Sequence, residues 1–183
     1  VWLDLLGKTT LIYMMSAYVF DIAVIGLGAA GSMAAIQAGR HTSNILALEK
    51  NACIGKKIML TGGGKCNVTN NAGIDSLMNA FGKQGVFYRQ AFMAFSSRAL
   101  IDFFDACGVE MTIEDSGRVL PKNKDASSIV GALGRRLSES KAKLIFNAPI
   151  SGIAKEGARF KVAIKAETFY WAKKVILAAG GAS

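Results

Sequence analysis

Residues Phe20–Gly31 read FDIAVIGLGAAG, and this stretch decides the fold. Its first half, Phe20–Ile25, is rich in aromatic and β-branched residues and ends at a glycine, which predicts a buried central strand. The second half has the spacing G-x-G-x-x-G, and Ala29–Gly39 continues as a small-residue helix with Gly39 available as its C-terminal stop. A strand, a glycine-rich turn and a helix in this order predict the opening of a dinucleotide-binding βαβ unit.

Each glycine of this turn has a separate physical task. Gly26 allows the chain to turn tightly, Gly28 allows the backbone to approach a pyrophosphate, and Gly31 allows the helix to pack on the strand. The N-terminus of the helix supplies free amides and a partial positive charge for the phosphates. The motif alone is weak support, because short glycine patterns also arise by chance, so the rest of the unit must be present.

The chain supplies the rest of the unit after the helix. Asn44–Leu48, NILAL, is predicted to be a second strand, and Glu49 follows it, 18 residues after Gly31. A carboxylate at this position can accept hydrogen bonds from the ribose hydroxyls of an adenosine. The alternative is that Glu49 is only a solvated strand end. Neither Glu49 nor the adjacent Lys50 distinguishes NAD from FAD.

A second glycine-rich stretch, TGGGKCNVTN at residues 61–70, follows this unit. It is not a P-loop, because Met59 stands five residues before Gly64 and Cys66 replaces the hydroxyl residue that would hold magnesium. Its bare backbone and its Asn, Thr and Lys side chains, with Lys56 and Lys57 nearby, predict a loop that faces an anionic or polar ligand.

These motifs together resemble a family of FAD-dependent oxidoreductases, the BaiN-like or aminoacetone-oxidase-like flavoproteins. They belong to the glutathione-reductase-type class with two dinucleotide-binding domains. The resemblance runs from about Tyr18 to Ser183 and rests on DIAVIGLGAAG, LALEK, GKKIMLTGGGKCNVTN, EDSGRVLPKNKDASSIV and VILAAGGAS. It implies an α/β fold, in which a Rossmann-like FAD-binding domain combines a parallel sheet with an antiparallel β-meander.

The resemblance also implies which residues hold the FAD, in three groups. The first group would hold the adenosine and pyrophosphate, the second would form the loop that runs toward the flavin, and the third would close on the cofactor through backbone. The groups are Gly26, Gly28, Ala29, Ala30, Gly31, Glu49 and Lys50; then Lys57, Thr61, Gly62, Gly63, Cys66 and Asn67; then Ile150 at the adenine with Ala178, Ala179 and Gly180. Family members often have threonine where this chain has Ala179. No catalytic acid or base is implied.

Composition limits the other classes of function. The chain has 183 residues, 51% of them hydrophobic and 19% charged, which is enough to bury the core of one domain. Its three cysteines form no C-x-x-C pair, and its single histidine, His41, has no second histidine to share a metal, so we expect no metal site and no disulfide framework. A reducing, cytoplasmic setting follows.

The formal net charge of +9 raises the alternative of a basic, non-catalytic binding module, for example for RNA. Because the basic residues are spread along the chain without a dense run, we instead expect a solvated surface, a small-molecule substrate and no nucleic-acid or membrane partner. The apolar stretch from Leu11 to Ala38 is not expected to cross a membrane, because Asp21 lies within it and glycines interrupt it.

The ends of the chain carry two further expectations. Residues 1–13 are predicted to be an extension or upstream readthrough, with the native start at Met14 or Met15. Residues 14–183 are predicted to form the FAD-binding domain, incomplete at its C-terminus because the substrate domain and the final strand of the family are absent. A truncated, non-functional remnant is the alternative.

The middle of the chain is predicted to be structural. Leu100, Phe103, Phe104 and Cys107 would share a helix face, residues 109–113 would form a strand, and residues 129–137 would line another helix. Leu144–Phe146 would add a strand to the main sheet, and residues 160–164 followed by TFYWA would form the meander that leads into a separate VILAAGG strand. The aromatic side chains of TFYWA would be meander core.

The chemistry implied by the resemblance is two-electron transfer through FAD, with hydride passing to or from flavin N5 and with NAD(P)H or oxygen as the other redox partner. An NAD(P)-dependent dehydrogenase with the same βαβ unit is disfavoured, because it has no use for TGGGKCNVTN. Cys66 lacks a second cysteine at C-x-x-C spacing, so a structural role is expected for it rather than a redox role.

Overall fold

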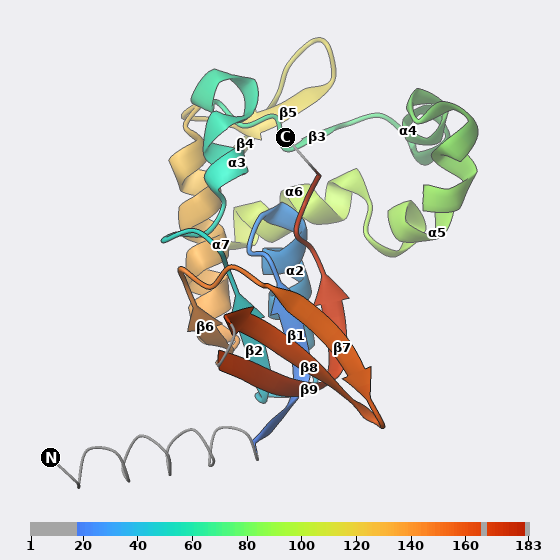
Figure 1. Ribbon diagram of the computed structural model, residues 1–183. Helices are drawn as coiled ribbons and strands as arrows, with labels where there is room; N and C mark the ends of the chain where they lie inside the picture. Colours follow the sequence, from blue (N-terminus) through green and yellow to red (C-terminus); the bar gives the residue numbers. More distant parts are fainter. Residues whose placement is uncertain (1–17, 166–167, 182–183) are drawn as a thin grey trace, which may run out of the picture. The chain divides into compact units, whose positions relative to one another are not determined.

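A computed structural model describes residues 18–165 and 168–181 of the chain, so the predicted extension at residues 1–13 lies outside the described residues. The chain folds as two compact units (Figure 1). Of the described residues, the first unit contains those up to residue 56 and those from residue 134 onward, and the second contains residues 57–133.

The first unit is built on a six-stranded sheet with the order β6-β2-β1-β9-β8-β7. The strands β6 (Lys143–Ile145), β2 (Ile45–Leu48), β1 (Val19–Ile25) and β9 (Thr168–Leu177) pair parallel to one another in this order. β8 (Arg159–Lys165) pairs antiparallel with β9, and β7 (Gly152–Glu156) pairs antiparallel with β8. The predicted α/β fold, with a parallel sheet and an antiparallel meander, is therefore confirmed.

Two central strands form because their residues are apolar on both faces. All four residues of β2 are buried, as are Ala23, Val24 and Ile25 of β1. The helix α2 (Ala29–Ala38) follows β1 and ends at Gly39 as predicted. A side chain at Gly39 would meet the Cβ of Ser140 at 2.7 Å, so the glycine lets the end of α2 approach the segment after α7 (Ala126–Glu139).

The meander differs from the prediction in one respect. TFYWA and VIL are a single ten-residue strand, β9, and not two strands. Its first half pairs antiparallel with β8, and its residues from Trp171 to Leu177 pair parallel with β1, from Val19 opposite Trp171 to Ile25 opposite Leu177. Tyr170 and Trp171 are buried, which confirms their core role, and Phe169 is half-buried.

The second unit contains a three-stranded antiparallel sheet and several short helices. The sheet has the order β3-β5-β4, formed by Thr69–Asn70, Arg118–Pro121 and Met111–Ile113. The helices are α3 (Lys56–Leu60, which begins at the boundary between the units), η1 (Thr61–Gly64), α4 (Ile74–Ala80), η2 (Gly82–Gln84), α5 (Gly85–Ala94) and α6 (Ser97–Ala106). The predicted helix face of α6 is shifted, because Ile101 and Phe104 are buried while Leu100, Phe103 and Cys107 are half-buried.

Candidate dinucleotide-binding site

The glycine-rich turn between β1 and α2 is fixed by backbone contacts at its two outer glycines. Gly26 has a positive φ of 90° and donates from its N–H to the carbonyl of Leu48 at 2.7 Å. A Cβ on Gly26 would lie 2.6 Å from the carbonyl oxygen of Ala178, and a Cβ on Gly31 would overlap the carbonyl oxygen of Gly26. Both positions therefore require glycine for the fold itself.

Gly28 is different, because the space beside it is open. A Cβ built on Gly28 meets no atom within 4 Å, and its φ of −73° is accessible to any residue. The fold therefore does not require glycine at this position. A ligand that must come close to the backbone would require it, which is the role predicted for the second glycine of the motif.

The N-terminus of α2 has free capacity for an anion. Its N-cap is Gly28, no side chain caps it, and no acidic residue occupies its first turn. The N–H of Ser32 bonds to the carbonyl of Gly28 at 3.0 Å, so the N–H groups of Ala29 and Ala30 precede the first helical hydrogen bond. Both alanines are exposed. Uncapped amides at the positive end of a helix fit a phosphate group.

Glu49 is buried, with 6% of its surface exposed, and its carboxylate faces the glycine-rich turn. Oε2 accepts from the N–H of Leu27 at 2.7 Å, and Oε1 accepts from the backbone and side-chain nitrogens of Asn51 at 2.9 and 2.6 Å. Because a carboxylate offers about four lone-pair positions, these three bonds leave one for a ligand hydroxyl. Asn51 was not identified from the sequence, although a polar residue two positions after the acid is a signal for such a bond.

Two further predicted segments lie beside this turn. The N–H of Ala148 bonds to the carbonyl of Glu49 at 2.9 Å, and Ile150 follows, half-buried against the core of the sheet. The N–H of Ala178 bonds to the carbonyl of Ile25 at 2.8 Å, and a Cβ on Gly26 would lie 3.1 Å from Cα of Ala179. The structure therefore gathers the predicted residues of the first unit around one turn. Gly180 has a positive φ of 77° and Lys50 is exposed, and their assignments stay predictions.

The second glycine-rich loop belongs to the second unit, together with the predicted Lys57, Thr61, Gly62, Gly63, Cys66 and Asn67. Gly62 and Gly63 adopt left-handed conformations, with φ of 61° and 65°, and both are exposed. Thr61 holds the base of the loop, because its hydroxyl donates to the carbonyl of Lys57 at 2.9 Å and its own carbonyl accepts from the N–H of Cys66 at 3.0 Å. Three successive glycines are required for this path, since left-handed backbone is costly for residues with a Cβ.

Cys66 lies near the end of this loop and combines an unusual backbone conformation with a buried side chain. It has a positive φ of 57° although it is not glycine, and its side chain is only 5% exposed. Burial raises the pKa of the Cys66 thiol, so the thiol is protonated at neutral pH. A buried, protonated thiol is a poor nucleophile, which supports the structural role expected for Cys66.

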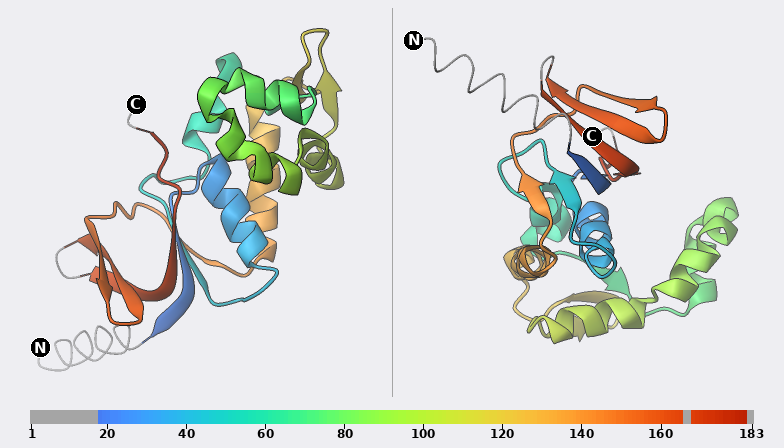
Figure 2. Two further views of the ribbon diagram at one scale, coloured as in Figure 1. Left: turned by 90° about the vertical axis from the view of Figure 1, so that its right-hand side faces the viewer. Right: turned by 90° about the horizontal axis from the view of Figure 1, so that it is seen from below.

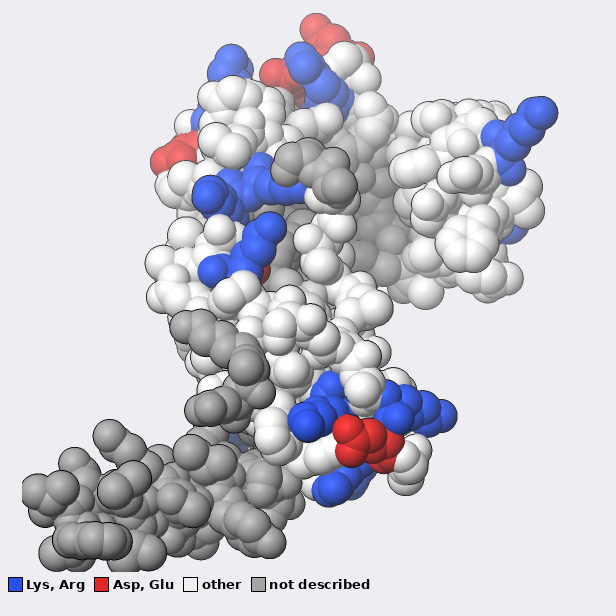
Figure 3. Space-filling model, viewed as in Figure 1, with Lys and Arg blue, Asp and Glu red and all other residues white. Residues whose placement is uncertain are grey.

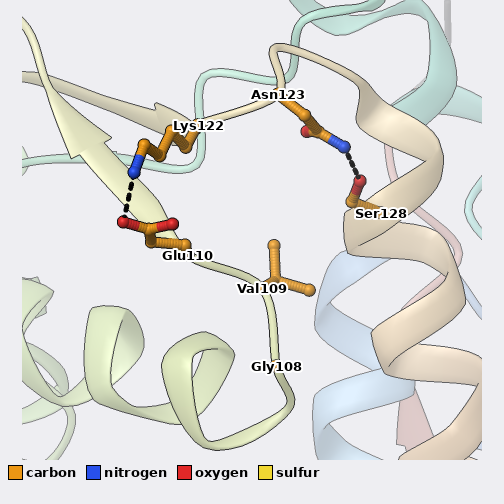
Figure 4. A pocket seen from close by; sticks show the side chains of 6 residues that line it. All are labelled: Gly108, Val109, Glu110, Lys122, Asn123 and Ser128. Carbon is orange, nitrogen blue, oxygen red and sulfur yellow. Dashed lines mark hydrogen bonds and ion pairs between the residues drawn. The ribbon is translucent and has the colours of Figure 1, made fainter.

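The second unit also contains a pocket, and Lys122, Asn123 and Ser128 of its lining belong to the motif EDSGRVLPKNKDASSIV (Figure 4). Its volume is about 290 Å³, and Gly108 and Val109 form part of its wall. An ion pair between Lys122 and Glu110 at 2.6 Å and a hydrogen bond from Asn123 to Ser128 at 2.6 Å hold its polar rim. These four side chains are thus engaged in contacts with one another at the rim.

Other types of site are not found within the described residues. In residues 18–165 and 168–181, no three His, Cys, Asp or Glu side chains gather as metal ligands would. Over the same residues, no helix combines the length and the apolar character that crossing a bilayer requires. His41 lies exposed in the turn after α2, as expected of a loop histidine.

Comparison with known proteins identifies the family and the fold of the chain. A family model described as the HI0933-like protein Rossmann domain matches residues 20–183, which is most of the chain. Among solved structures, a 3-ketosteroid-delta4-(5alpha)-dehydrogenase from Rhodococcus jostii RHA1 superimposes with a TM-score of 0.61 at 14% identity, covering 88% of this chain and 46% of that one. At this identity the likeness shows the fold alone.

Two curated relatives align over most of the chain. A 3-dehydro-bile acid delta(4,6)-reductase from Clostridium scindens is 32% identical over 162 residues, which is 87% of this chain and 39% of the relative. A ribosomal RNA dihydrouridine synthase from Escherichia coli is 26% identical over 165 residues, which is 90% of this chain and 40% of the relative. The chain thus spans about two fifths of the length of these relatives.

Proposed function

The chain belongs to the HI0933-like Rossmann-domain family, the flavoprotein family that its motifs resemble, and we propose that its glycine-rich turn binds the adenosine diphosphate half of FAD. The observation that carries the proposal is the open space beside Gly28, at the uncapped N-terminus of α2. Packing requires glycine at positions 26 and 31, whereas no contact within the chain requires it at position 28.

The residues of the first unit would divide the binding task. The amides of Ala29 and Ala30 would donate to the pyrophosphate, and no acidic side chain in the first turn of α2 opposes its charge. The remaining lone pair of Glu49 would accept from a ribose hydroxyl. Because the same carboxylate already holds the N–H of Leu27, it would fix the turn before the ligand arrives.

The loop of the second unit, from Thr61 to Asn67, is proposed to contact the cofactor through backbone. The exposed glycines Gly62 and Gly63 leave the peptide groups accessible, and Cys66 holds the end of the loop in place. Lys57 would add positive charge at the base of this loop.

When bound, FAD supplies two-electron chemistry at flavin N5. We propose that the protein of which this chain is the FAD-binding portion is an oxidoreductase, with a small-molecule substrate and with NAD(P)H as the electron donor. The name of the Clostridium scindens relative, a reductase of a 3-dehydro-bile acid, supports a small-molecule substrate. None of the three cysteines forms a disulfide in the described structure, which supports the proposal of a reducing, cytoplasmic setting.

An RNA substrate is a second candidate, favoured by a specific feature of the meander. Arg159 lies over the ring of Trp171 at 3.7 Å and Lys161 lies over the ring of Phe169 at 4.3 Å. Basic side chains gather around these strands (Figure 3), and the whole chain has a net charge of +9. A basic surface attracts the phosphates of nucleic acids, and the Escherichia coli relative is named for a ribosomal RNA modification.

The visible absorption spectrum of the purified chain, after incubation with FAD and desalting, tests the first proposal. We expect a retained flavin spectrum that is lost in Gly28→Val. The matched control is Gly73→Val, because Gly73 is also the N-cap of a helix, has extended φ and ψ, and has open space beside it. Equal flavin retention by both variants would refute binding at the Gly28 turn.

The RNA candidate has its own measurement. Filter binding of ribosomal RNA fragments should weaken as salt is raised, and Arg159→Ala should weaken it further, while Gly28→Val leaves it unchanged. If Arg159→Ala binds RNA as the unmodified chain does, the meander is not an RNA-binding surface.

A further inference from the structure

The helix α5 is apolar on nearly every side. Its sequence is GVFYRQAFMA, with Arg89 and Gln90 as its only strongly polar residues. On one side, Tyr88 and Phe92 contact Phe81 at ring-centroid distances of 4.9 and 5.8 Å. This side faces α4 and η2 and forms the small internal core of a helical hairpin, seen in green in Figure 2.

The opposite side of α5 is also apolar and faces solvent. Val86 is 74% exposed, Phe87 83% and Met93 60%. Val86, Gln90 and Met93 follow the spacing i, i+4, i+7, so they form one continuous stripe, and Phe87 flanks it. A helix that is hydrophobic all round is normally buried, yet Gly85 is the only buried residue of α5.

The hairpin of α4, η2 and α5 depends mostly on itself for support. Its helices pack on one another, and neither α4 nor α5 has an extensive contact with another described helix or strand. At the crossing, Gly85 lies directly against the carbonyl of Met78. Helices of this length are marginal in water without tertiary packing, so a further partner would stabilise the exposed face.

Charge indicates what kind of partner fits. Within residues 74–95 the charged residues are Asp75, Lys83 and Arg89, and Asp75 pairs with Arg89 at 3.5 Å. The hairpin therefore has a net charge of +1 (two basic residues less one acidic), whereas the whole chain has +9. Figure 3 shows the surface over α4 and α5 as largely white. Two copies of the chain would repel each other at most surfaces, and this nearly neutral face is where they can meet.

We propose that this face, formed by Val86, Phe87, Gln90 and Met93, is the interface between two copies of the chain, related by a twofold axis across α5. Two hairpins facing each other would make a four-helix arrangement, in which each stripe packs against its own copy. With Phe95, which ends α5 and is 38% exposed, the large apolar side chains of this face offer on the order of 500 Å² per copy. Two copies would bury about 1,000 Å², near the lower limit for a specific interface. The proposal does not depend on flavin binding.

Sedimentation equilibrium over a dilution series tests it. We expect the unmodified chain to approach twice its mass of 19.4 kDa, and Phe87→Lys to stay at 19.4 kDa at every concentration. Ile113→Lys is the matched control, because Ile113 is an exposed apolar residue of the same unit, 49% exposed, and it should leave the dimer intact. Circular dichroism establishes that each variant is folded.

Cross-linking locates the axis independently of any destabilising variant. In a Cys53→Ser background, Gln90→Cys should form a disulfide-linked dimer on oxidation, because a twofold axis across the stripe brings residue 90 near its own copy. Ile113→Cys should not. An unmodified chain that stays monomeric throughout the dilution series would overturn the proposal, as would a dimer that survives Phe87→Lys and fails to cross-link through residue 90. Binding of a monomer to lipid vesicles through Phe87 would also overturn it.

Discussion

The N–H of Leu27 donates to the carboxylate of Glu49 at 2.7 Å, across 22 residues of sequence. This bond joins the glycine-rich turn after β1 to the end of β2, so the proposed ribose-binding residue also shapes the proposed phosphate-binding loop. Since both groups are buried, the bond lies where water cannot replace it. Glu49 therefore has a structural role that is separate from any ligand.

The first prediction concerns this bond. Glu49→Gln replaces one acceptor oxygen by an NH₂ group, which must face an N–H of either Leu27 or Asn51. We expect the free energy of unfolding to fall by about 1–3 kcal/mol and FAD retention to be lost. Urea denaturation and the flavin spectrum measure the two effects. Glu156→Gln, in the exposed strand β7, is the control, and an equal effect from it would contradict the role of Glu49.

The second prediction separates folding from binding at two glycines of one motif. In Gly31→Ala the added methyl overlaps the carbonyl oxygen of Gly26, so the free energy of unfolding should fall by about 3 kcal/mol. In Gly28→Ala the methyl meets no atom within 4 Å, so stability should be retained while FAD binding weakens. Thermal melts with and without FAD distinguish the pair. A destabilised Gly28→Ala would show that packing, not a ligand, selects this glycine.

The third prediction concerns pH and Asp21. Hydrogen bonds from Lys173 at 2.8 Å and Thr42 at 2.7 Å hold the pKa of the Asp21 carboxyl below its usual range. Because the pKa is lower in the folded state, the stabilisation is fully present above the unfolded-state pKa, near pH 4, and is lost as pH falls through the folded value. Asp21→Asn should therefore lower the stability at neutral pH and flatten its decline in acid.

Denaturant melts between neutral pH and about pH 2 measure this dependence, across the unfolded-state pKa. The exposed Asp115, replaced by Asn, serves as the control. If Asp21→Asn and the unmodified chain lose stability in parallel as the pH falls, Asp21 does not contribute the expected pH dependence.

The fourth prediction concerns the cysteines. Burial raises the pKa of Cys66, whereas Cys53 is exposed, so a maleimide should label Cys53 rapidly and Cys66 only after the loop opens. Mass spectrometry of peptides from a labelling time course measures both rates. Equal rates for the two thiols in the folded chain would argue for an accessible, reactive Cys66.

Much of the first unit could be predicted from local sequence. The apolar run of Phe20–Ile25, the glycine spacing and the small-residue helix each have one favourable arrangement, and the structure forms β1, the turn and α2 within a residue of the expected bounds. Val162 and Ile164 are likewise both buried, as expected for alternate residues on the core-facing side of a strand. In these segments local preference and tertiary packing agree.

The sequence-based predictions were wrong where the structure of one segment depends on its packing against more than one neighbouring segment. The sequence predicted two strands in TFYWAKKVIL, yet it forms the single strand β9, because β8 pairs with Thr168–Ala172 and β1 pairs with the overlapping stretch Trp171–Leu177. The buried side of α6 was shifted for a related reason, since its spacing allowed a face through Leu100 as readily as one through Ile101. Only the contacts of the folded chain choose between such faces.

The order of a strand, a glycine turn, a helix and an acid at Glu49 could be recognised as a dinucleotide-binding unit from the amino-acid sequence, because these features depend on residue size and local backbone freedom. The role of each residue depends on the contacts that the folded chain makes. It showed that Gly26 and Gly31 are required by contacts with Ala178 and with each other, that Gly28 is not, and that Asn51 shares the carboxylate of Glu49 with Leu27. Contacts between residues far apart in the chain have no local signature, so they become visible only in the folded molecule.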